Sequence, residues 1–104
     1  MVVSVKIPNG AARIAMPRRF DFMMNRKFIK SYTPLLDDAT IREIEIELSA
    51  VDFLDSSALD MLILLKERAR AANKSIALLN ISTLISRALE ITDLSGMFSI
   101  RHAT

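Results

Sequence analysis

The sequence predicts an α/β domain in which a mixed β-sheet of about four to five strands is covered by about three to four helices. First, segments with strand-like and helix-like patterns alternate along the chain, which favours right-handed crossovers in a partly parallel sheet. Second, Asn9 and Gly10 lie between two short apolar runs, an arrangement typical of a β-hairpin. Third, a chain of 104 residues that is 51% hydrophobic predicts a single domain over residues 1–104 with one core.

Each element is predicted from its own pattern. Apolar and acidic residues alternate over residues 41–48, which is the period of a strand with one buried face. Residues 75–79 are largely apolar, as expected for a strand at the centre of a covered sheet. Asp21 and Ser82 are suitable caps for the helices that follow them, and Pro34 is expected to end the first helix. The predicted strands are 2–7, 11–16, 41–48, 75–79 and 99–100, and the predicted helices are 22–32, 56–72 and 83–92.

The alternation within the central predicted strand assigns its side chains to the two faces of the sheet. The apolar set, predicted to be buried, consists of Ile44, Ile46 and Leu48. The acidic set, predicted to line a solvated face or edge where charge discourages unwanted strand pairing, consists of Glu43, Glu45 and Glu47. Four aromatic residues are predicted to pack in the core, namely Phe22, Phe28, Tyr32 and Phe53.

Composition excludes several kinds of chemistry. The chain has no cysteine and a single histidine, His102, so disulfides, thiolate metal sites and groups of several catalytic or metal-binding histidines are excluded. No apolar run approaches the ~18 residues that a membrane-spanning helix needs, and the N-terminus lacks the pattern of a signal peptide. We therefore expect a cytoplasmic protein with no membrane partner. Residues 1–36 are basic, but their charges are spread over three predicted elements, so no direct nucleic-acid partner is expected.

The candidate functional motif is the run from Asp55 to Leu59 at the start of the best predicted helix. Small polar residues suit this position because their oxygens accept hydrogen bonds from the unpaired N–H groups of the first turn. One hypothesis is that Asp55 or Ser56 is simply a helix cap. The other is that a phosphoryl group on Ser56 acts as a switch, because the helix dipole favours the phosphate while a docked partner would be repelled.

The distribution of side chains around the predicted helix 56–72 helps to decide between a simple helix cap and a switch. At ~100° per residue, most apolar side chains gather on one face that we assign to the core. The predicted core set is Ala58, Met61, Leu62, Leu65, Ala69 and Ala72. Ile63 and Leu64 fall on the outward side among Ser56, Asp60 and Glu67. Either the helix is buried nearly all round, or Ile63 and Leu64 belong to a surface that binds a partner.

Residues 51–60 resemble the central signature of STAS domains, the domains of anti-sigma factor antagonists. That signature is an apolar and aromatic pair followed by Asp-Ser-Ser/Thr-Gly-Leu-Gly at the start of a helix. Residues 75–79, 80–90 and 92–100 resemble the strand, the loop with its helix, and the helix exit that follow in the family. Ala58 and Asp60 depart from the family pattern, which has glycine at both positions.

The resemblance implies a STAS-like fold and a bacterial partner-switching role in transcription regulation. The unphosphorylated protein would bind and sequester an anti-sigma factor that is also a histidine-kinase-like, ATP-dependent serine kinase. Phosphorylation at Ser56, or as second choice at Ser57, would release it, and a metal-dependent phosphatase of the PP2C type would reverse the change. The expected partner-binding residues are Asp55, Ser56, Ser57, Asp60, Ile63, Leu64 and Glu67. We expect a monomer or weak dimer that is not an enzyme, with no catalytic residue, metal or cofactor of its own.

Three alternatives remain open. The domain could be a constitutive STAS accessory subunit of a transporter ATPase or of a larger signalling assembly, with no need for phosphorylation. It could instead be an enzyme that holds a divalent cation with Asp52, Asp55 and Asp60, although their spacing is loose. Finally, it could bind a nucleotide, as is suggested for some STAS domains, although the sequence indicates no pocket for one.

Overall fold

A mixed sheet of five strands forms the centre of the molecule, in the order β1-β2-β4-β6-β7. The computed structural model describes residues 2–102, and of Ser95 only the backbone. Strands β1 and β2 are antiparallel, and every other neighbouring pair in this sheet is parallel. A second sheet consists of the short parallel strands β3 and β5. The strands are β1 (Val3–Ile7), β2 (Ala11–Ala15), β3 (Arg19–Phe20), β4 (Glu43–Glu47), β5 (Phe53–Leu54), β6 (Ser75–Leu79) and β7 (Ser99–Arg101).

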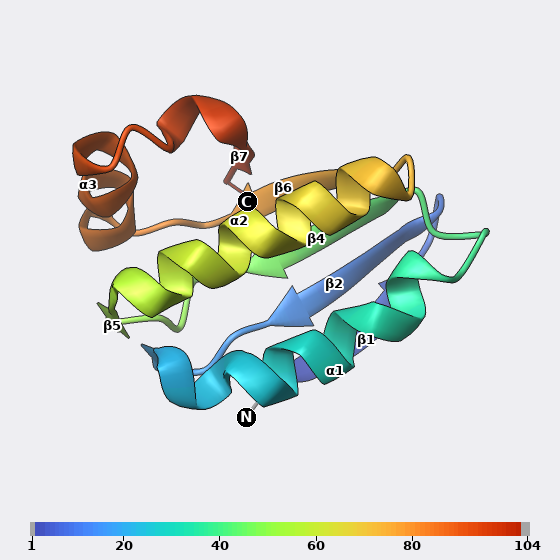
Figure 1. Ribbon diagram of the computed structural model, residues 1–104, viewed down its shortest axis with the longest axis horizontal. Coiled ribbons are helices and arrows are strands. Elements are labelled where there is room, and N and C mark those ends of the chain that lie inside the picture. Colours follow the sequence, from blue (N-terminus) through green and yellow to red (C-terminus); the bar gives the residue numbers. More distant parts are fainter. Residues whose placement is uncertain (1, 103–104) are drawn as a thin grey trace.

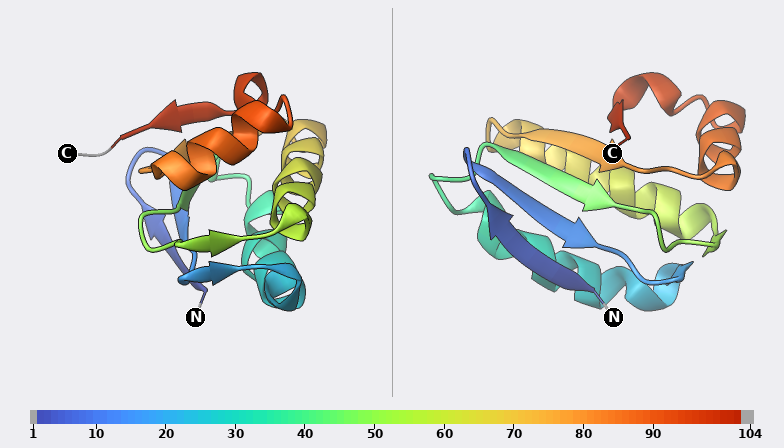
Figure 2. Two further views of the ribbon diagram at one scale, coloured as in Figure 1. Left: turned by 90° about the vertical axis from the view of Figure 1, so that its left-hand side faces the viewer. Right: turned by 180° about the vertical axis from the view of Figure 1, so that it is seen from behind.

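The helices lie mainly on one side of the sheet. Helices α1 and α2 contact each other and run side by side across one face (Figure 1). Seen from behind, the strands face the viewer and no helix crosses them, while α3 lies beyond one end of the sheet (Figure 2). The predicted α/β fold class is therefore confirmed, with the helices α1 and α2 on a single face. The helical elements are η1 (Phe22–Met24), α1 (Asn25–Leu36), α2 (Ser56–Ala71), α3 (Thr83–Ile91) and η2 (Ser95–Met97).

The apolar core lies between this sheet and the two long helices. Ile44 and Ile46 of β4 are fully buried beneath them, and Leu48 just after the strand is 1% exposed, as the alternation predicts. Phe28 and Tyr32 of α1 are also fully buried and meet edge to face, with ring centroids 5.1 Å apart. The predicted single domain also includes positions 1, 103 and 104, which lie outside the described residues. No helix among residues 2–102 has the length and apolar character that crossing a membrane requires.

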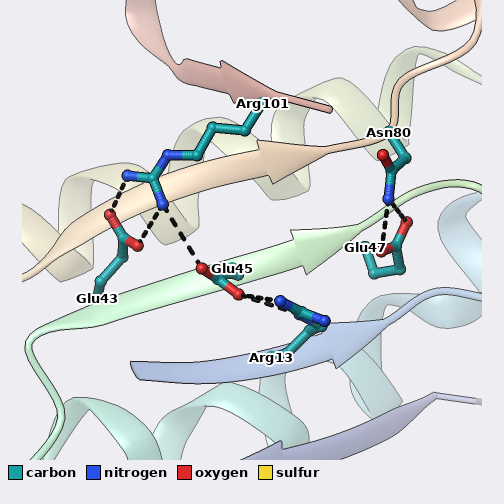
Figure 3. A network of polar contacts seen from close by, with 6 residues as sticks. All are labelled: Arg13, Glu43, Glu45, Glu47, Asn80 and Arg101. Atoms are coloured by element: carbon teal, nitrogen blue, oxygen red, sulfur yellow. Dashed lines mark hydrogen bonds and ion pairs between the residues drawn. The ribbon is translucent and has the colours of Figure 1, made fainter. Parts of the chain in front are cut away.

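The acidic side chains of β4 lie on the sheet face that no helix covers, but the expectation of an edge is wrong and this face is not simply solvated. Strand β4 lies in the middle of the sheet, and Glu45 is only 8% exposed. Arg13 of β2 is opposite Glu45 in the register, and its Nη2 lies 2.9 Å from Glu45 Oε1. Arg101 of β7 reaches across β6, donating to both Glu43 oxygens at 2.7 Å and approaching Glu45 at 3.5 Å (Figure 3). These arginines supply the neutralising charge that a buried carboxylate requires.

The same network shifts the ionisation of the glutamates. Hydrogen bonds from Arg101 hold the pKa of Glu43 below its ordinary value, and the reciprocal interaction raises the pKa of Arg101. Burial on its own would raise the pKa of Glu47, but hydrogen bonds from Asn80 and from Ser49 outweigh it and the net direction is down. Both carboxyl groups are therefore stabilised as anions in the folded protein.

The first helix departs from its prediction at both ends. Asp21 is a cap as expected, but it accepts from the Met23 N–H and begins the 3₁₀ turn η1, not the α-helix. The α-helix then runs from Asn25 to Leu36 with Pro34 inside it, so the expectation that Pro34 ends the helix is wrong. A proline in the last turn removes only one helical hydrogen bond, and the buried Leu35 anchors that turn against the core.

The glutamate–arginine network predicts how stability responds to pH. Because the folded-state pKa of Glu43 is depressed, its contribution is present above its ordinary pKa and is lost as pH falls from about 5. Arg101→Gln should lower the free energy of unfolding at pH 7 by about 1 kcal/mol and flatten its fall in acid. Urea unfolding from pH 7 to pH 3 measures both, with Arg87→Gln as the control, because Arg87 is exposed on α3. Equal pH slopes in wild type and Arg101→Gln would contradict this account.

Candidate functional site

The candidate site begins with a short strand that the sequence did not predict. Residues 51–55 belong to none of the predicted strands, but Phe53 and Leu54 form β5 and pair in parallel with β3. The Arg18 guanidinium holds the start of this segment, with Nε and Nη2 donating to Asp52 Oδ2 at 2.9 and 2.6 Å. Two-residue strands are too short for alternation to reveal them, which explains the missed pair.

Asp55 is the N-cap of α2. Its backbone is extended, and its Oδ1 accepts from the Ala58 N–H at 3.0 Å. Of the two candidate caps that the sequence left open, the structure therefore selects Asp55. This choice leaves the hydroxyl of Ser56 free of the capping role.

The two serines of the motif differ in their surroundings. Ser56 is the first residue of α2, it is exposed, and its hydroxyl makes no hydrogen bond within the described part of the chain. Ser57 is half-buried and lines a groove beside the helix. A group attached to Ser56 would sit at the N-terminal end of a 16-residue helix, where the dipole and the unpaired N–H groups favour negative charge.

The faces of α2 follow the predicted pattern closely. Ala58, Met61, Leu62, Leu65 and Ala69 are buried, Leu59 joins them, and the predicted Ala72 is half-buried at the C-cap. Ser56, Asp60 and Glu67 are exposed, so the helix is not buried all round. Ile63 and Leu64 are half-buried, each with part of its side chain open to solvent.

A groove of about 330 Å³ runs between α2 and the segment that begins α1. Among the predicted site residues, the structure brings Ser57, Asp60 and Leu64 into this groove, while Ser56, Ile63 and Glu67 lie outside its lining. The complete lining is Phe22, Asn25, Ser57, Asp60, Met61 and Leu64.

Two of the four aromatic residues that were predicted to pack in the core lie at the surface instead. Phe28 and Tyr32 are buried as predicted, but Phe22 is 62% exposed and Phe53 is 40% exposed. The Arg19 guanidinium stacks over the Phe53 ring at 4.2 Å, and Met23 beside Phe22 is 67% exposed. The 3₁₀ turn η1 accounts for Phe22 and Met23, because a single turn offers no periodicity that distinguishes its buried from its exposed side.

The structure does not gather Asp52, Asp55 and Asp60 into the cation site that the metal-dependent hypothesis required of them. Asp52 is engaged by Arg18, Asp55 by the helix cap, and Asp60 lies in the groove. Across residues 2–102, no three aspartate, glutamate, histidine or cysteine side chains come close enough to hold a metal ion.

Fold and motif together define an α/β domain with an exposed serine at the start of its longest helix. The family model described as "Mlab, STAS domain" matches residues 3–100, so this chain belongs to the STAS-domain family. A STAS-domain containing protein of Pseudomonas aeruginosa (strain UCBPP-PA14) is 34% identical over 87 residues, covering 84% of each chain. The resemblance to STAS domains inferred from the sequence is thus confirmed.

Solved structures with low sequence identity share the fold. The anti-sigma factor antagonist SpoIIAA of Bacillus, in its unphosphorylated form, matches all of this chain and 90% of its own, at 13% identity and a TM-score of 0.79. A STAS domain protein of Planctomyces limnophilus matches 99% of this chain and 90% of its own, at 19% identity and a TM-score of 0.83. The murine anion transporter Slc26a9 matches 79% of this chain with 14% of its own, at 18% identity and a TM-score of 0.70.

The capping geometry predicts that neighbouring residues of the motif differ in their effect on stability. Asp55→Ala removes the side-chain acceptor of the Ala58 N–H and should cost about 1 kcal/mol of unfolding free energy. Ser56→Ala should change it by less than about 0.5 kcal/mol, because this hydroxyl has no partner in the described chain. Urea unfolding tests both, with Ser82→Ala, the cap of α3, as a positive control. A larger loss for Ser56→Ala than for Asp55→Ala would refute this assignment.

Proposed function

We propose that this protein is an anti-sigma factor antagonist that works by partner switching. The unphosphorylated form binds and sequesters an anti-sigma factor that is also an ATP-dependent serine kinase. Phosphorylation of Ser56 by that kinase releases the complex, and a PP2C-type phosphatase restores the binding form. The protein itself is a substrate and a binding module in the bacterial cytoplasm, and the partner kinase supplies the ATP chemistry.

The observation that carries this proposal is the exposed, unengaged hydroxyl of Ser56 at the N-terminus of α2. A kinase needs an accessible hydroxyl, and Ser56 is more accessible than the half-buried Ser57. The first turn of α2 stays capped by Asp55, so modification of Ser56 leaves the fold intact. The helix N-terminus accommodates the phosphate, and the protein therefore survives the modification that changes its binding.

The docking surface of this proposal comprises the groove and the outward stripe of α2. It combines apolar anchors, Phe22 and Leu64, with the exposed carboxylate of Asp60 one turn from Ser56. A phosphoryl group adds a charge of about −1.5 to −2, and a partner that fits the unmodified surface would have to desolvate it. Binding is therefore weakened without any conformational change in this chain. The proposed surface consists of Phe22, Asp55, Ser56, Ser57, Asp60, Ile63, Leu64 and Glu67.

The second candidate function is a constitutive accessory subunit of a transporter ATPase or of a larger signalling assembly. The observation in its favour is that the same fold occurs within an anion transporter, Slc26a9. In this case the docking surface would be occupied permanently and Ser56 would serve only as the first residue of a helix. The two candidates differ in whether charge on Ser56 changes binding.

The switch proposal predicts a modification and a matching change in partners. Protein purified from its own host under several growth conditions should carry an addition of about 80 Da that maps to Ser56. In pull-downs, Ser56→Ala should retain a kinase-like partner and Ser56→Asp should weaken its binding at least about tenfold, because the added charge must be desolvated in the interface. Affinity for the captured partner is then measured by isothermal titration calorimetry.

A matched control separates this effect from that of a negative charge added elsewhere on the protein. Thr83 is the first residue of α3, directly after its cap, so Thr83→Asp adds the same charge at the equivalent position of another helix. This variant should bind like wild type. A single partner held equally by wild type, Ser56→Ala and Ser56→Asp, with no phosphate in any condition, would reject the switch in favour of the accessory-subunit function.

The docking surface makes a further prediction that both candidate functions share. Phe22→Ser and Leu64→Ala remove apolar contact from the groove and should each weaken partner binding at least about tenfold, as truncation of central interface anchors does. Ile91→Ser on α3 removes an apolar side chain that is even more exposed, at 84%, and lies outside the groove, so it should leave binding unchanged. Calorimetric titration measures the affinities, and thermal unfolding verifies that each variant is folded. Equal losses in all three variants would exclude the groove as the docking site.

A further inference from the structure

A second groove lies at the other end of α2 from Ser56. Its volume is about 510 Å³, and it opens where the strands β4, β6 and β7 begin. Because α2 is 16 residues long, its two ends are about 24 Å apart. The lining consists of Arg42, Lys66, Arg70, Asn73, Lys74, Ser75, Ile76 and Ser99.

The charge of this groove is entirely of one sign. Four of its lining residues are cations, none is acidic, and three others carry hydroxyl or amide groups. Six ion pairs join basic and acidic side chains of the described chain, and they involve none of these four cations. The lining residue Ser75 donates to the Glu43 carboxylate at 3.2 Å, but Arg101 already neutralises that carboxylate. The groove therefore holds four positive charges without a carboxylate partner in residues 2–102.

Parts of this cluster are held in place by the backbone. The Lys74 ammonium donates to the carbonyls of Asp38 at 2.9 Å and Ile41 at 2.6 Å, which leaves one of its three donors free. Arg42 lies against Gly10, where an added Cβ would come within 3.0 Å of its Nε. Lys66 and Arg70 are one turn apart on the same flank of α2. Side chains from a loop, a helix and a helix exit thus converge on one space.

Stabilisation of the helix dipole explains only part of the cluster. Arg70 lies in the last turn of α2, where a cation is favourable. Lys66 precedes that turn, and Arg42 belongs to the segment before β4, so neither is one of the last-turn cations of α2. Their convergence with Lys74 indicates a site for an anion.

We propose that this groove binds a soluble ligand that carries two or more neighbouring phosphate groups. Arginine forks and lysine ammonium groups both recognise phosphate oxygens, and the neutral donors Asn73, Ser75 and Ser99 can bind the remaining oxygens. Two phosphates bring enough charge to balance four cations, whereas a carboxylate ligand would need one group for each. The volume of the groove exceeds the needs of a single phosphate.

This site is separate from the proposed switch. Lys66 and Arg70 lie on the flank of α2 away from the groove that contains Ser57 and Asp60. Ligand binding here would leave the docking surface uncovered, so both can be occupied together. The site stands whether or not Ser56 is phosphorylated in the cell.

The test uses inorganic tripolyphosphate as the probe. Calorimetry and amide NMR shifts should show one site per chain, with the largest shifts at residues 66–76. Lys66→Gln and Arg70→Gln should each weaken binding at least about tenfold, because each removes a charge-assisted contact. Arg87→Gln removes an exposed arginine outside the groove and should bind like wild type, and so should Ser56→Asp. Thermal unfolding of each variant verifies the fold.

Comparison ligands identify the chemistry that the groove recognises. Citrate offers three carboxylates and should bind more weakly than tripolyphosphate, as should single orthophosphate. Vesicles of phosphatidylglycerol serve as an anionic surface, and a single-stranded oligonucleotide serves as a polymeric anion. Binding to either of these without saturable binding of tripolyphosphate would overturn the proposal, as would equal losses in Arg70→Gln and Arg87→Gln.

Discussion

The burial of an acidic strand in the middle of the sheet governs where the other elements lie. One side of β4 carries Ile44 and Ile46, which are fully buried under the helices, so this strand has to be central. The other side carries Glu45, which no helix covers and which is nonetheless almost inaccessible. A carboxylate in that position is stable only beside fixed positive charge. Arg13 on one neighbouring strand and Arg101 on the last strand provide it (Figure 3).

This requirement links the two ends of the chain. Arg101 belongs to a strand of three residues, and its bidentate contact with Glu43 ties that edge to the centre of the sheet. Arg13 does the same for the N-terminal hairpin. The glutamates that a local view assigns to solvent therefore organise the sheet face that lacks helices.

Helix α2 connects two grooves that differ in the charge of their lining residues. At its N-terminus, Asp55 closes the first turn and leaves Ser56 exposed near a groove lined by both apolar and polar side chains, with Asp60 as its charged residue. At its C-terminus, Lys66 and Arg70 border a groove lined by cations alone among its charged residues. The helix dipole has the matching sense at both ends, since it favours anionic groups at the first turn and cations at the last. The proposed modification at one end and the proposed anionic ligand at the other are both consistent with this dipole.

Local patterns in the chain were sufficient for most helices and strands and for the buried face of α2, and they narrowed the cap of α2 to Asp55 or Ser56. The periods of helix and strand are set by backbone geometry, so they appear in any short window. The strand order, the neutralised glutamates and both grooves came only from the folded chain. Their contacts join residues 32 and 58 positions apart, such as Arg13 with Glu45 and Glu43 with Arg101. No short window encodes which distant strand becomes a neighbour, because that choice depends on how all the apolar faces are buried together.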